Sequence, residues 1–296
     1  MSGPSRALVL GGGGFTGIAW MTGVLAGLRE AGLDLGAADL VVGTSAGSMV
    51  GARLTAGLDI EESYQALVAE GPQRSRTPGE RARSGGQKGA GGRLDPGTLL
   101  RWGWAGVRSR DPQRFRARVG RAAMAVTAPA GPAAHRARVA ALLAVAQWPA
   151  RRLLVTAVDA ESGEFVAFDR DSGVDLVDAV AASCAVPGVW PPVAIGDRHW
   201  MDGGMRSMAN ADLAAGYERV VVLAPLQFGV GHLVPVEAQV RRLREHARVV
   251  LMSPDQAARQ AIGRNMLDPR RQGPAARAGR TQAATLAARV REVWQG

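Results

Sequence analysis

One pattern occurs twice in the first 57 residues: an apolar stretch, a turn of small residues, and a segment with apolar side chains at helical spacing. The two copies cover residues 6–10, 11–14 and 18–29, then residues 40–42, 43–47 and 48–56. Strands that alternate with helices in this way lie side by side and parallel in one sheet. The sequence therefore predicts an α/β fold.

Further elements follow from the same patterns. We expect strands at residues 152–158, 164–168, 199–201, 219–223 and 248–252, and helices at residues 174–185, 236–247, 255–262 and 275–294. The first two of these strands are separated by a turn around Ser162 and Gly163, which predicts a hairpin.

The middle of the chain differs in character. Residues 71–97 are rich in glycine, proline and arginine, which predicts a mobile surface loop. Residues 98–150 regain helical periodicity, and Pro112 and Pro132 are suitable first residues of helices. We expect this second segment to be a helical insertion that caps a pocket, within a single domain of 296 residues.

Composition restricts location and partners. The N-terminal apolar stretch is too short for a secretory signal, and the chain has no apolar run of the ~20 residues that span a bilayer. Cys184 is the only cysteine, which excludes an internal disulfide. We therefore expect a cytoplasmic protein.

The net charge is +10, and nearly all of the positive side chains are arginines. These arginines are not interleaved with the aromatic residues that stack bases, so no nucleic-acid partner is predicted.

The first motif is a glycine run, Gly11 to Gly14, between the first strand and the first helix. Backbone amides can crowd around an anion there, and the helix dipole favours negative charge. Gly12, Gly14 and Gly17 also match the G-x-G-x-x-G pattern of dinucleotide sites. Such a site needs an acidic residue at the end of the second strand, where this chain has Ser45 instead, so this interpretation is disfavoured.

The second motif, Gly43-Thr44-Ser45-Ala46-Gly47, matches the G-x-S-x-G nucleophile elbow. A serine on a sharp turn between strand and helix needs glycine on both sides to avoid clashes, whereas an ordinary N-cap serine is the competing interpretation. The usual base for a serine is histidine, and four are available: His135, His199, His232 and His246. The elbow follows a single strand, which is too early for the α/β-hydrolase topology.

The third motif is Asp202-Gly203-Gly204, which taken alone is typical of a tight turn. The order of the three motifs, a glycine run, an early G-x-S-x-G and a late Asp-Gly-Gly, resembles that of patatin-like phospholipases. The resemblance extends to the small residues and proline at 181–187, and it covers roughly residues 6–57 and 152–224.

The resemblance implies a three-layer α/β/α architecture, a mostly parallel sheet and a helical cap. It implies Ser45 as nucleophile, Asp202 as its only catalytic partner, an oxyanion hole made by the amides of Gly12, Gly13 and Gly14, and lipid acyl esters as substrates, with no metal or cofactor. The residues that support these motifs are Gly11, Gly17, Gly43, Gly47, Gly203 and Gly204. The chain departs from the family at Thr16, where an arginine or lysine is usual.

Two questions stay open at this point. The alternative to an enzyme is an idle lipid- or nucleotide-binding α/β protein. The arginines between Arg74 and Arg93 could form a solvated linker, and the alternative is that they make peripheral contact with anionic membranes.

A carboxylate with an ordinary pKa of about 3.9 is a poor base for a hydroxyl. We therefore expect the site of Asp202 to be desolvated, because burial raises the pKa of a carboxyl group.

Overall fold

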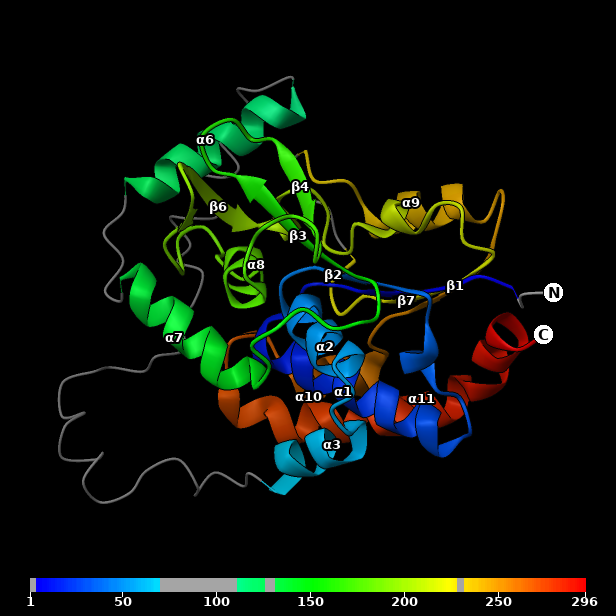
Figure 1. Cartoon of the computed structure of the whole chain (residues 1–296). Coiled ribbons are helices and arrows are strands. Elements are labelled where there is room, and N and C mark those ends of the chain that lie inside the picture. The colour runs from blue at the N-terminus through cyan, green and yellow to red at the C-terminus, as the bar shows by residue number, and fades with distance from the viewer. Residues whose placement is uncertain (1–3, 70–110, 126–130, 228–231) are drawn as a thin grey trace, which may run out of the picture.

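The computed structural model describes residues 4–69, 111–125, 131–227 and 232–296, and one sheet organises them (Figure 1). The strands follow the order β5-β6-β3-β2-β1-β7-β8, and β4 pairs with β3 outside this path. Their bounds are β1 Arg6–Leu10, β2 Leu40–Gly43, β3 Leu153–Asp159, β4 Phe165–Phe168, β5 Val193–Ile195, β6 Arg198–Asp202, β7 Arg219–Leu223 and β8 Arg248–Met252.

The sheet is parallel at its centre and antiparallel at one side. Strands β1 and β2 are adjacent and parallel, with Leu8 opposite Val41, as the repeated pattern predicts. Strands β3, β7 and β8 continue the parallel part. Strands β4, β5 and β6 pair antiparallel, and the β3–β4 pair confirms the predicted hairpin. The three-residue strand β5 was not expected from the sequence.

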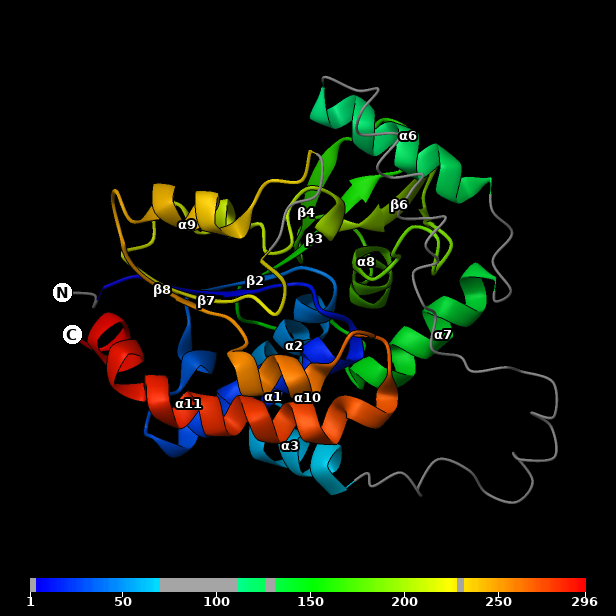
Figure 2. The same cartoon turned by 180° about the vertical axis from the view of Figure 1, so that it is seen from behind.

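Helices cover both faces of the sheet, which confirms the α/β fold with three layers (Figures 1 and 2). Along β1, Leu8 and Leu10 face the larger core, whereas Ala7 and Val9 face a second one. The helices are α1 Gly14–Glu30, α2 Ala46–Thr55, α3 Ile60–Ala69, α6 Pro112–Met124, α7 Pro132–Leu143, α8 Leu176–Ser183, α9 Val236–Leu243, α10 Gln256–Ile262 and α11 Gln272–Trp294.

The C-terminal helix α11 lies along α1, so the two ends of the chain stabilise each other (Figure 2). The indole nitrogen of Trp20 in α1 donates to the Gln282 side chain in α11 over 3.0 Å, and both side chains are buried. Helix α1 thereby has a fixed position, and with it the glycine run that precedes it.

The predicted helix starts at Pro112 and Pro132 are confirmed by α6 and α7. The predicted loop at residues 71–97 lies outside the described residues, as do residues 98–110 of the predicted insertion. Helix α3 was not expected. In the part of the chain that the structure describes, no helix has both the length and the hydropathy needed to cross a bilayer.

Candidate active site

Ser45 occupies a strained turn between β2 and α2. Its backbone has φ 52° and ψ −118°, a conformation that L-residues rarely adopt, and its side chain does not cap α2. The N-cap interpretation is therefore wrong. A Cβ at Gly47 would lie 1.9 Å from the Leu10 carbonyl oxygen, and one at Gly43 would lie 2.5 Å from the Cα of Ser48. Both glycines are needed for the turn to form, which is what a nucleophile elbow requires.

The structure brings Ser45 and Asp202 together. The register places Gly43 opposite Val155, and it places Asp202, at the end of β6, opposite Ala157 on the same strand β3. The Ser45 side chain lies close enough to the Asp202 carboxylate to act on it as a donor, which lowers the pKa of Asp202. Only 8% of Ser45 and 4% of Asp202 is exposed, so this pair lies at the edge of the protein interior.

Burial raises the pKa of Asp202 to about 7, because the carboxylate loses its hydration. Hydrogen bonds from the Ser45 side chain and from the Gly204 amide, at 2.7 Å from Oδ1, act in the opposite direction but are outweighed. Its surroundings include the thiol of Cys184. The expected desolvation of Asp202 is therefore present in the structure.

The glycine run lies against the nucleophile, since a Cβ at Gly12 would lie 3.5 Å from the Cβ of Ser45. The Gly12 amide, however, donates to the Met208 carbonyl over 2.7 Å, which makes it unavailable to a substrate oxygen. The expectation of three oxyanion donors is therefore wrong for Gly12. The amides of Gly13 and Gly14, at the start of α1, have no acceptor among the described residues.

Two polar side chains that have no predicted role hold this site. Ser183 Oγ accepts the backbone N–H of Ser45 over 2.9 Å. Asn210 is fully buried and its Nδ2 lies 3.0 Å from Thr44 Oγ1 and 3.2 Å from the Gly203 carbonyl oxygen. Ser183 lies within the small-residue segment that resembles the family, whereas nothing in the local pattern around Asn210 indicates these contacts.

The four histidines do not contact Ser45. His135 donates from Nε2 to the Ala181 carbonyl, and burial lowers its pKa. His199 contacts Glu161, the ring of His232 lies against that of Phe115 at a tilted angle, and His246 lies at the opposite end of the sheet. Burial raises the pKa of the Cys184 thiol to about 12, so this thiol remains protonated at neutral pH and is no competing nucleophile. Among the described residues, Asp202 is therefore the only candidate base beside Ser45.

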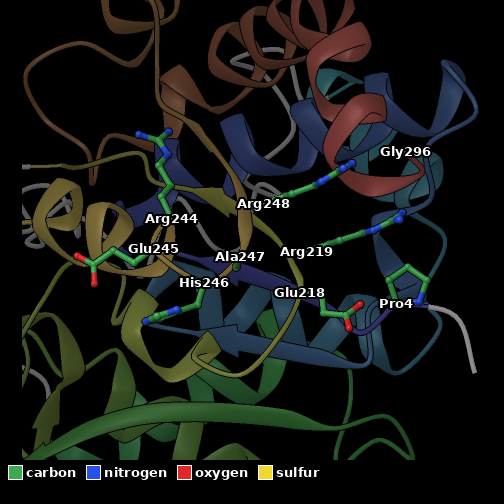
Figure 3. A pocket seen from close by; sticks show the side chains of 9 residues that line it. All are labelled: Pro4, Glu218, Arg219, Arg244, Glu245, His246, Ala247, Arg248 and Gly296. Atoms are coloured by element: carbon green, nitrogen blue, oxygen red, sulfur yellow. The ribbon is translucent and has the colours of Figure 1, made fainter.

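An open pocket of about 450 Å³ lies elsewhere, at the amino-terminal ends of β7 and β8 (Figure 3). Side chains of both charges line it, among them Glu218, Arg219 and Arg248. Ser45 and Asp202 do not line it. Within the described ranges, no group of three or more His, Cys, Asp or Glu side chains is placed to hold a metal ion.

Structural comparison found distant similarity to bacterial effector proteins. VipD from Legionella pneumophila is 13% identical, with a TM-score of 0.47 over 97% of this chain and 67% of VipD. The type III effector protein ExoU is 17% identical, with a TM-score of 0.42 over 98% of this chain and 53% of ExoU. ExoU of Pseudomonas aeruginosa in complex with SpcU gives a TM-score of 0.41 at 17% identity, over 99% of this chain and 53% of that one. The chain thus spans about half the length of ExoU.

Sequence comparison gives the family. Comparison with curated proteins found no significant match. The family model for patatin-like phospholipases matches residues 8–215, well over half of the 296 residues. This range contains the glycine run, the elbow and the Asp-Gly-Gly turn. The chain belongs to the patatin-like phospholipase family.

Proposed function

We propose that this protein hydrolyses acyl esters of lipids, with Ser45 as nucleophile and Asp202 as the only general base. The observation that carries the proposal is the close approach of the two side chains, one on a strained elbow and the other buried with a raised pKa. Membership of the patatin-like phospholipase family supports the lipid hydrolase class. The dyad and the donors of the oxyanion hole are our assignments.

In the first half-reaction, Asp202 accepts the Ser45 proton while Ser45 Oγ attacks the ester carbonyl carbon. The carbonyl oxygen becomes an oxyanion, and the free amides of Gly13 and Gly14 are the donors that would stabilise it, by about 2.7 to 4 kcal/mol each when well aimed. Collapse of the intermediate breaks the ester C–O bond. The leaving alkoxide takes the proton from Asp202, and the acyl group stays on Ser45.

In the second half-reaction, Asp202 takes a proton from water and the hydroxide attacks the acyl-enzyme. The intermediate expels Ser45 Oγ, which recovers the proton from Asp202, and the fatty acid is released. A base with a pKa near 7 suits both steps, because about half of it is ionised at pH 7 and it is still basic enough to accept a proton in the transition state.

The alternative that Ser45 is idle is tested with a fluorophosphonate probe, which labels only an activated serine. We expect the wild-type protein to be labelled, and both Ser45→Ala and Asp202→Asn to lose labelling and nitrophenyl-ester hydrolysis. Ser172→Ala, at an exposed serine, is the control and should be labelled like the wild type. Undiminished labelling of Ser45→Ala would overturn the assignment, and absence of labelling in the folded wild type would favour the idle protein.

A further inference from the structure

Arg138 in α7 has an unusual environment. Its guanidinium carbon lies 5.0 Å from the ring centroid of Phe15 and 5.5 Å from that of Trp190. The side chain is partly buried, and within the described ranges it has neither a carboxylate partner nor a hydrogen-bond acceptor. Burial without a counter-charge lowers the pKa of Arg138, although an arginine remains charged at neutral pH.

The neighbouring arginine on the same helix is different. Arg136 lies at the surface and is ion-paired with Asp178. The guanidinium of Arg138 thus retains its N–H donors, which are arranged in a planar fork that matches the oxygens of phosphate or carboxylate. A partly buried charge that is held by two aromatic rings and has no acceptor among the described residues is the arrangement of a binding group whose partner is a ligand.

One aromatic neighbour adjoins the glycine run, and the other is linked through His135 to α8, the helix that supports Ser45. Phe15 directly follows Gly14, whose amide is one of the proposed oxyanion donors. Trp190 stacks on His135 at 4.9 Å between ring centroids, and His135 donates to the carbonyl of Ala181 in α8. The same helix α8 ends at Ser183, which accepts the N–H of the nucleophile.

We propose that Arg138 binds a phosphate group of the lipid substrate beside the active site, so that the enzyme prefers esters whose head group carries a phosphodiester over neutral acylglycerols. This inference rests on the proposed function, since it names the substrate class of the same site. It also offers a reason why this chain can have Thr16 where the family usually has an arginine or lysine. The buried hydroxyl of Thr16 donates to the Met266 carbonyl and supplies no charge. The positive charge near the glycine run comes instead from α7.

The test compares two esters of equal chain length as monomers in solution, dihexanoyl phosphatidylglycerol and dihexanoylglycerol. Monomeric substrates exclude attraction to a charged membrane surface. The readout is the ratio of kcat/KM for the first substrate to kcat/KM for the second. We expect Arg138→Gln to lower this ratio about tenfold or more, because charge-assisted hydrogen bonds to phosphate are lost. Arg138→Lys, which keeps the charge without the fork, should give an intermediate ratio.

Arg136→Gln is the matched control, because it removes the same charge from the same helix at a position that already has a carboxylate partner. Its ratio should equal that of the wild type within about twofold, as expected for an exposed ion pair. A ratio unchanged by Arg138→Gln, or lowered equally by Arg136→Gln, would overturn the proposal.

A binding measurement separates this inference from the catalytic one. In a Ser45→Ala background, calorimetric titration with dihexanoyl phosphatidylglycerol should show binding that Arg138→Gln weakens, whether or not Ser45 is the nucleophile. Titration with inorganic phosphate distinguishes the source of the anion. Binding of free phosphate as tight as binding of the lipid, or lipid binding that is indifferent to Arg138, would contradict a head-group site.

Discussion

The side-chain amide of Asn210 donates to the hydroxyl of Thr44 over 3.0 Å, and the same nitrogen lies 3.2 Å from the carbonyl oxygen of Gly203. Thr44 immediately precedes the proposed nucleophile, and Gly203 immediately follows the proposed base. One buried side chain therefore links the two turns that carry the dyad. Its own backbone is left-handed, with φ 51°, a conformation that asparagine tolerates better than most residues.

We expect Asn210→Ala to destabilise the fold by about 2 to 4 kcal/mol, because buried partners lose their hydrogen bonds and alanine disfavours a positive φ. The kcat of ester hydrolysis should fall about tenfold to a hundredfold with little change in KM, since small displacements between reacting groups are costly. Thermal unfolding and steady-state kinetics on the folded protein measure the two effects.

Asn210→Gly separates the causes, because glycine adopts φ 51° without strain but lacks the amide. The predicted loss of kcat should persist in this variant while part of the stability returns. Wild-type kcat in Asn210→Gly would show that the side chain does not position the dyad.

The backbone strain at Ser45 gives a second prediction. Ser45→Gly and Ser45→Ala both remove the hydroxyl, but only glycine relieves the positive φ. We therefore expect Ser45→Gly to be more stable than Ser45→Ala by about 1 to 3 kcal/mol, the cost of a residue held in a sparsely populated region. Chemical denaturation of the two inactive variants checks this difference, and equal stability would mean that the elbow is not strained in solution.

The pKa of Asp202 predicts the pH dependence of activity. The carboxyl acts as a base only when ionised, so kcat/KM for a neutral ester should fall tenfold per pH unit below about 7 and level off above it. A nitrophenyl ester that does not itself ionise is the suitable substrate. An acid limb centred near pH 4, the ordinary range of an aspartate, would contradict a desolvated Asp202.

The same pKa predicts an effect on stability. A carboxyl whose pKa rises from 3.8 to about 7 on folding stabilises the protein fully below pH 3.8, and this contribution is lost as pH rises through 7. Asp202→Asn removes the buried charge and keeps an acceptor for the Gly204 amide. At pH 8 we expect this variant to be more stable than the wild type, by on the order of 1 to 4 kcal/mol, since one pKa unit corresponds to about 1.36 kcal/mol. The difference should vanish near pH 4, and denaturation at both pH values measures it.

Local patterns predicted much of the fold, whereas the approach of Ser45 to Asp202 was predicted by the resemblance to patatin-like phospholipases. Apolar runs predicted seven of the strands, and the central ones read as continuous hydrophobic stretches because both faces of the sheet are buried there. Glycine at 43 and 47 identified the elbow because nothing larger fits. Helix α3, which was not predicted, does carry a readable signal, because acidic Glu61 and Glu62 lie in its first turn.

Other features depend on contacts between distant segments. The carbonyl that occupies the Gly12 amide belongs to Met208, and the rings around Arg138 come from two segments on either side of it in the chain. No periodicity or motif encodes such pairings. Strand β5 has only three residues, which is too few for alternation to be recognised.

The packing of Gly47 gives the last prediction. Adding a methyl group there would place a carbon 1.9 Å from the Leu10 carbonyl oxygen, in the strand that leads into the glycine run. We expect Gly47→Ala to separate α2 from β1, with loss of activity and a destabilisation of about 3 kcal/mol or more, as for severe overpacking. Gly131→Ala is the control, since its backbone has φ −64° and a methyl group there would contact nothing within 4 Å. Wild-type thermal stability and esterase activity in Gly47→Ala would mean that α2 and β1 are not in contact at this point. This packing would then not be what holds Ser45 toward Asp202.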